Sequence, residues 1–253
     1  MTRKEIRKEY RFKKRELRKN FKKSKKELEI EYIDKINEVL EIDQIKEVPF
    51  RYTLEEIGNA ISHGLGSLFA ILAFVFMLFK VDSKVEMFSI IVYFVGLFLL
   101  FTMSCLYHAF KYGSKVKRLF RRFDYSSIYL LIGSTFAPIL LCYIGGIKGN
   151  IFFIIQWVAI IVGITMISIF GPGKLKWLHF PLYIVLGWSG LMFLPYMIKN
   201  DFMLFIYILG GGIVYTGGLI PFSIDKKVSH FIWHIFVLMG AIIQWLGIYL
   251  YII

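Results

Sequence analysis

Two histidines stand four residues apart in the stretch SHFIWHIFV, so His230 and His234 would project from one face of a helix. Paired imidazoles at this spacing are a recurrent half-site for zinc, although the same spacing also arises in ordinary helix packing. His108 closes a second apolar stretch, FTMSCLYHAF, and would complete a set of three ligands. Three protein ligands leave a fourth zinc position open for water, as in catalytic sites. The sequence therefore predicts a metal site at His108, His230 and His234.

Two further polar residues are candidate catalytic groups. Asp124 begins the stretch FDYSSIYLL, and its carboxylate could deprotonate water or orient a ligand. Ser104 lies one turn before His108 and could hold water, substrate or a histidine N–H, although helical serines often bond their own backbone instead. The neighbouring Cys105 would point about 100° away from Ser104 on an ideal helix, which argues against a thiolate ligand.

A third polar group lies in the stretch EEIGNAISHGLG. Glu56, Asn59 and His63 fall at steps of three and four, so they share a helix face, with Ser62 beside them. This face either contacts the substrate and supports the metal site or forms a polar packing seam between helices. His179, in KWLHFP, has no companion at ligand spacing and is interpreted as an interfacial side chain.

The elements that must position these residues are membrane helices. The chain has 253 residues, of which 57% are hydrophobic, more than a soluble domain can bury. Backbone groups in hydrocarbon must be satisfied within each segment, which favours helices about 20 residues long. We therefore predict an all-α, seven-transmembrane helix bundle in residues 50–253. The apolar runs are 57–79, 86–109, 124–147, 150–169, 177–198, 202–220 and 229–252.

The charges between the runs predict the orientation. With the N-terminus in the cytoplasm and the C-terminus outside, the short connections place eleven Lys/Arg residues inside and four outside. This orientation brings all five histidines into the cytoplasmic leaflet, where ionisable side chains are costly and usually functional. The expected location is the cell membrane, crossed several times.

Residues 1–49 form a separate N-terminal arm that is first basic and then acidic. Residues 1–28 hold fourteen Lys/Arg against four Glu, and residues 29–49 hold seven acidic residues against two Lys. A helix on anionic lipid headgroups is one interpretation, with about 1 kcal/mol from each cation near the surface. A determinant of topology is the alternative. No nucleic-acid partner is expected, because no reading motif accompanies the basic run.

Four motifs in order resemble the progestin and adipoQ receptor (PAQR) family, with the bacterial haemolysin III branch as the best fit. They are E-x-x-N-x-x-S-H-x-x-G at 56–66, S-x-x-x-H at 104–108, FDYSSIYLLIGSTFAP from Asp124 and HFIWHIFVLMG from His230. The resemblance covers about residues 50–253. It implies a seven-helix bundle with a cytoplasmic N-terminus and zinc bound by the three histidines near that face. It also implies that Ser104 and Asp124 accompany the metal-bound water.

The resemblance leaves the function open between two classes. The wider superfamily includes alkaline ceramidases, which hydrolyse a lipid amide, and this implies a zinc-dependent hydrolase of lipid amide or ester bonds acting in membrane lipid homeostasis. The bacterial branch carries a haemolysin name, which implies a pore-forming cytolysin; a receptor-like sensor with structural zinc is a further alternative. One departure is Gln244, where relatives often carry a histidine. The run Gly210–Gly212 is interpreted as helix packing.

Overall fold

The computed structural model describes residues 3–46, 48–49, 51–224 and 226–253, and the chain divides into two units, Met1–Glu47 and Val48–Ile253. In the first unit, the helix α1 spans Arg3–Lys46. Ion pairs one turn apart support this helix, for example between Lys13 and Glu9, whose charged atoms are 3.0 Å apart. Tyr10, Leu17 and Phe21 are exposed along it.

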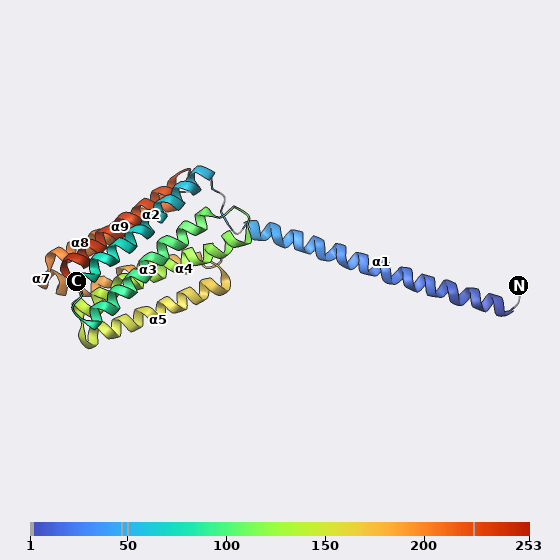
Figure 1. Cartoon of the computed structure of the whole chain (residues 1–253), viewed down its shortest axis with the longest axis horizontal. Helices are drawn as coiled ribbons and strands as arrows, with labels where there is room; N and C mark the ends of the chain where they lie inside the picture. The colour runs from blue at the N-terminus through green and yellow to red at the C-terminus, as the bar shows by residue number, and fades with distance from the viewer. Residues whose placement is uncertain (1–2, 47, 50, 225) are drawn as a thin grey trace. The chain divides into compact units, whose positions relative to one another are not determined.

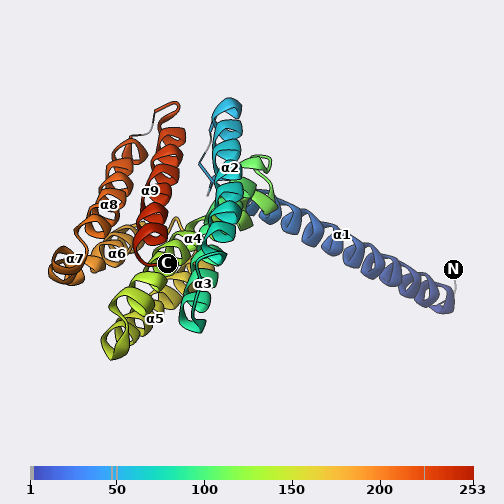
Figure 2. The same cartoon turned by 60° about the vertical axis from the view of Figure 1, so that its left-hand side comes forward.

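In the described part of the second unit, seven helical segments are long and apolar enough to cross a membrane, which confirms the predicted all-α bundle of seven spans. The helices run side by side (Figures 1 and 2). Their bounds are α2 (Thr53–Leu78), α3 (Lys84–Ala109), α4 (Lys115–Pro138), α5 (Gly146–Phe170), α6 (Lys176–Trp188), α7 (Leu194–Asn200), α8 (Phe202–Ser223) and α9 (Ser229–Tyr251).

Two of the seven spans are irregular. A π-helical turn, Ile139–Ile144, extends α4 beyond Pro138, and a 3-10 turn, Ser189–Phe193, joins α6 to α7 within one span. Proline lacks a backbone N–H, so the hydrogen-bond ladder is interrupted where α4 gives way to the wider turn. Gly145 and Gly146, both at positive φ, then reverse the chain into α5.

The start of α4 differs from the prediction. The helix begins at Lys115, nine residues before the predicted start of the third apolar run, and Ser114 caps it by accepting a hydrogen bond from the Lys117 backbone N–H at 3.1 Å. Lys117 and Arg121 are therefore helical residues, and they are only 1% and 5% exposed. The sequence predicts a connection between the runs 86–109 and 124–147 here, because its cations count toward the cytoplasmic side.

The packing brings together the helices that carry the polar motifs. α3 packs against both α2 and α4, and α9 packs against both α2 and α8. Gly96 allows the close approach of α3 and α4, because a β carbon there would collide with Ser134. Cys105 and Cys142 are both free thiols.

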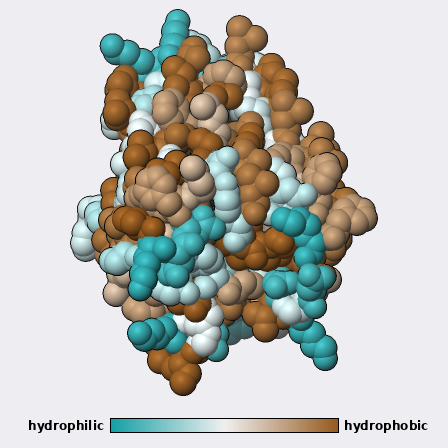
Figure 3. Space-filling model, turned by 90° about the vertical axis from the view of Figure 1, so that its left-hand side faces the viewer, coloured by the Kyte–Doolittle hydropathy of each residue, from teal (hydrophilic) through white to brown (hydrophobic). Residues whose placement is uncertain are grey.

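The exterior of the bundle is suited to lipid. Large aliphatic side chains on the outward face of α5 are exposed, including Ile154, Ile155, Val158 and Ile161. Such a continuous apolar surface would be unusual on a soluble monomer. Figure 3 views the left-hand side of Figure 1 and shows hydrophilic residues in separate patches among hydrophobic ones.

Candidate metal centre

The three histidines predicted as ligands come together at one end of the bundle. His108 stands in the last turn of α3, and His230 and His234 stand in the first two turns of α9. One potential ligand atom from each lies within 4.8 Å of the others, and all three side chains are buried. Nitrogen ligands of a tetrahedral zinc ion lie about 3.3 Å apart, so small side-chain movements would bring these three onto one ion.

The hydrogen bonds of His108 determine which nitrogen is available to a metal. Its Nδ1 lies 2.5 Å from Oε2 of Glu56 on α2. Because an ionised carboxylate only accepts hydrogen bonds, Nδ1 carries the proton and Nε2 keeps its lone pair. Within the described part of the chain, that Nε2 atom is buried without a hydrogen-bond partner, as is Nδ1 of His234. Buried, unpartnered nitrogens beside a carboxylate-oriented imidazole fit a metal site.

Lys117 is a member of this site that the sequence analysis missed. Its Nζ lies 3.2 Å from Oε1 of Glu56 and donates to the Tyr107 backbone carbonyl at 2.8 Å. The cation therefore holds the carboxylate that orients His108, and it also binds a backbone carbonyl at the C-terminal end of α3. The signal that could have found it is Ser114 three residues earlier, which predicts a helix start there.

The polar face of α2 contacts the histidines unevenly. The His63 ring stacks on the His234 ring, with 3.7 Å between centroids and 21° between planes. The Asn59 amide nitrogen lies 3.4 Å from Nδ1 of His108. The Ser62 hydroxyl instead donates to the backbone carbonyl of Asn59 at 3.0 Å, so this side chain is bonded within its own helix.

Asp124 and Ser104 form a pair beside the cluster. The Asp124 carboxylate on α4 accepts a hydrogen bond from the Ser104 hydroxyl on α3, and the cations Arg121 and Arg51 interact with it electrostatically. Both members of the pair line the same cavity as His234. A carboxylate in this place can take a proton from a group held within the cavity.

Comparisons with known proteins agree with the motifs. Residues 51–245 match the family described as Haemolysin-III related, a range that contains the whole histidine cluster. The chain belongs to the haemolysin-III related family. It is 33% identical over 208 residues to "Hemolysin-3" of Bacillus cereus, covering 80% of this chain and 94% of that protein. It is 35% identical over 193 residues to "Hemolysin-3 homolog" of Bacillus subtilis (strain 168), covering 74% of this chain and 89% of that protein.

In this haemolysin-III related chain, the fifth histidine lies apart from the cluster. His179 on α6 is 1% exposed, and its Nδ1 is 2.9 Å from the Tyr129 hydroxyl on α4. A hydrogen-bonding partner on the neighbouring helix accounts for its burial, and its position at the membrane interface stays a prediction. Cys105 is also absent from the group of potential ligands among the described residues.

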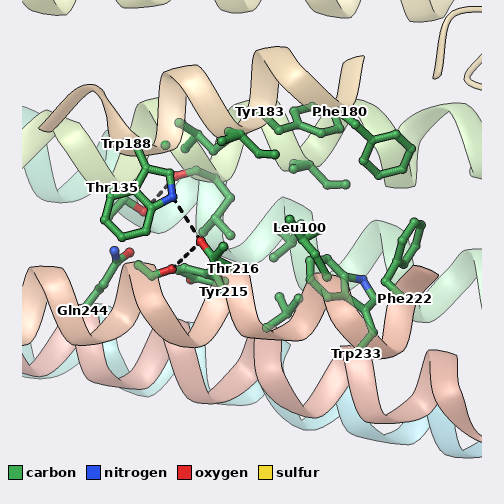
Figure 4. A pocket seen from close by; sticks show the side chains of 18 of the residues that line it. Leu100, Thr135, Phe180, Tyr183, Trp188, Tyr215, Thr216, Phe222, Trp233 and Gln244 are labelled. Atoms are coloured by element: carbon green, nitrogen blue, oxygen red, sulfur yellow. Dashed lines mark hydrogen bonds between the residues drawn. The ribbon is translucent and has the colours of Figure 1, made fainter. Parts of the chain in front are cut away.

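A cavity of about 200 Å³ begins at the histidine cluster and continues between the helices. Its walls come mainly from α3, α4, α6, α8 and α9, and they include Ile128 and Val237. Figure 4 shows Phe180 and Trp233 on opposite sides of it. Such predominantly apolar walls with a few polar groups are typical of sites for hydrophobic ligands. The cavity reaches Gln244, ten residues beyond His234 on α9.

Proposed function

We propose that this protein is a zinc-dependent hydrolase of lipid amide or ester bonds that acts within the membrane. The proposal rests on one observation, that a candidate metal site and an apolar cavity lie at the same place in the bundle. Three buried histidines lie beside the Ser104–Asp124 pair, and an apolar cavity begins at the same place. The histidines supply metal ligands, and the cavity supplies space for an acyl chain.

The donor set supports a metal of borderline softness such as zinc. Neutral imidazole nitrogens are preferred zinc ligands, and no other described residue hydrogen-bonds to Nε2 of His108 or Nδ1 of His234. When bound, zinc supplies Lewis-acid polarisation of a carbonyl and lowers the pKa of water. Glu56 keeps the proton on Nδ1 of His108, so the lone pair of Nε2 remains directed to the ligand position.

Side chains of the protein would supply proton transfer, positioning and exclusion of water. Asp124 accepts a proton from water as the water oxygen bonds to the carbonyl carbon of the substrate. The carbon–nitrogen or carbon–oxygen bond then breaks, and Asp124 returns the proton to the leaving amine or alcohol. Ser104 holds the carboxylate in position, and the cavity walls exclude bulk water from the reacting bond.

The orientation that best fits this function has the N-terminus and the histidine cluster on the cytoplasmic side. The excess of Lys and Arg in the connections at that end supports it. We expect a cysteine added after Ile253 to react with a membrane-impermeant maleimide on intact cells, after Cys105 and Cys142 are replaced by alanine. A cysteine in the Lys226–Lys227 connection should react only after lysis. Reaction of the latter cysteine on intact cells would reverse the proposed orientation.

Turnover by purified protein tests the catalytic proposal. We expect lipid amides of the ceramide class or phospholipid esters to be hydrolysed, and we expect a chelator to abolish the reaction because the histidines then lack their metal. Added zinc should restore it. Release of fatty acid is measured by mass spectrometry, with a single-chain substrate and a two-chain substrate compared. Failure to release fatty acid from either class, by protein that holds zinc, would overturn the hydrolase proposal.

A second candidate function is permeabilisation of membranes, which the name "Hemolysin-3" of the Bacillus cereus relative favours. The two functions are separable with the same preparation. A pore should release dye from liposomes equally with wild-type protein and with the Asp124→Asn variant, because the proposed proton acceptor has no part in it. A hydrolase should lose product formation in that variant.

A further inference from the structure

The deep end of the cavity carries a second polar group of side chains. Tyr215 from α8, Gln244 from α9 and Thr135 from α4 line it together, as Figure 4 shows. Gln244 stands ten residues beyond His234 on α9, which is about 15 Å along an ideal helix. These side chains therefore cannot belong to the metal centre, and nothing in the proposed chemistry uses them.

Close approach of α8 and α9 positions two of these side chains. A β carbon at Gly211 would collide with the Gln244 side chain, and one at Gly240 would press against the Tyr215 ring. Each of the two helices thus has a glycine at the point where a polar side chain of the other helix packs against it. The Gly210–Gly212 run was interpreted as packing; Gly211 does pack closely, and it makes room for Gln244.

The hydrogen-bonding capacity at this end is only partly used. The Thr216 hydroxyl accepts from the Trp188 indole N–H at 3.0 Å and donates to the Gly212 carbonyl at 2.8 Å. Thr135 donates to the Leu131 carbonyl at 2.8 Å and retains acceptor capacity. The Tyr215 hydroxyl, however, is buried and has no hydrogen-bond partner among the residues that the structure describes. A buried hydroxyl left in this state costs free energy, which a ligand group would recover.

We propose that Tyr215 and Gln244 bind a hydroxyl group carried part-way along the acyl chain of a lipid whose head lies at the histidine cluster. A hydroxyl both donates and accepts hydrogen bonds, so one hydroxyl can bond to the Tyr215 hydroxyl and to the Gln244 amide at the same time. The charged residues that line the cavity, Arg51 and Asp124, lie at its histidine end, so a neutral ligand group suits the deep end. This inference rests on the proposed function only in placing a lipid chain in the cavity.

The separation of the two ends indicates where the hydroxyl belongs. An extended chain covers about 1.2 Å per bond, so about 15 Å corresponds to about twelve bonds. Octadecanoic acid with a hydroxyl on carbon twelve is therefore the probe, and two acids serve as controls. They are plain octadecanoic acid and the isomer with its hydroxyl on carbon two, which would leave Tyr215 unpartnered.

Binding of the three acids to purified, zinc-loaded protein in nanodiscs tests the proposal, by competition against a fluorescent fatty acid. We expect the carbon-twelve hydroxy acid to bind about tenfold more tightly than the other two, the effect of roughly one net buried hydrogen bond. Tyr215→Phe combined with Gln244→Leu should abolish that preference while plain octadecanoic acid binds as before. Tyr207→Phe, on the same helix but outside the cavity lining, should keep it.

The possible failures have different meanings. Equal binding of all three acids to wild-type protein would overturn the subsite and leave the proposed lipid cavity standing; a water molecule between Tyr215 and Gln244 would then complete their hydrogen bonds. A preference that survives the double variant would also overturn it. If none of the acids bound, the cavity would not be a lipid-binding site, and the proposed function would fail as well.

Discussion

Replacing His234 by alanine is expected to reduce bound zinc from about one ion per chain to near zero, because a three-ligand site that loses one ligand keeps too few donors. His234 lies at the centre of the histidine cluster. Its ring centroid lies 4.7 Å from that of His108 and 4.8 Å from that of His230, and the His63 ring stacks on it. Elemental analysis of purified protein measures the loss, and circular dichroism checks that the helices remain.

Two further variants make this experiment specific. Glu56→Gln should weaken zinc binding by about 10- to 100-fold without removing it, because Glu56 orients His108 but is not a ligand. His179→Ala removes a histidine that lies outside the cluster, and it should leave the zinc content unchanged. Metal-free wild-type protein with an intact fold, or a His234→Ala variant that retains its zinc, would end the three-histidine proposal.

The helices and the histidine set were predictable from the sequence because they depend on coarse physical constraints. Apolar length and backbone satisfaction in hydrocarbon leave little choice but helices, and short connections force neighbouring spans to alternate in direction. Alternation alone brings the end of α3 and the start of α9 to one side of the bundle. His108, His230 and His234 could therefore be grouped before any side-chain position was known.

The finer features depend on packing between helices, which periodicity does not report. Lys117 was counted among the cations of a connection because charged residues usually lie outside the apolar spans. It is nevertheless buried, and its ion pair with Glu56 and its hydrogen bond to the end of α3 offset the loss of hydration. Likewise, His179 has no neighbour at ligand spacing in the sequence, and its partner Tyr129 lies on another helix. The cavity that reaches Gln244 depends on how several helices cross, and this could not be foreseen from the sequence.

Replacing Asp124 by asparagine is expected to lower the rate of hydrolysis by about 10²- to 10⁴-fold, the usual contribution of a positioned proton acceptor. Asparagine keeps the size of the side chain and an oxygen that can accept the hydrogen bond from Ser104, but it cannot take a proton from water. The measurement is the turnover number with saturating lipid substrate. Zinc content measured on the same sample should stay at the wild-type level.

The zinc content is what distinguishes a proton acceptor from a residue that supports the metal. If Asp124→Asn lost activity and zinc together, Asp124 would be a support of the metal site, as Glu56 is through His108. Ser104→Ala provides the graded comparison, since it removes one hydrogen bond from the carboxylate and should cost only about tenfold in rate. A variant series in which Ser104→Ala costs as much as Asp124→Asn would instead make the hydroxyl the essential group, and the proton would have to leave by another path.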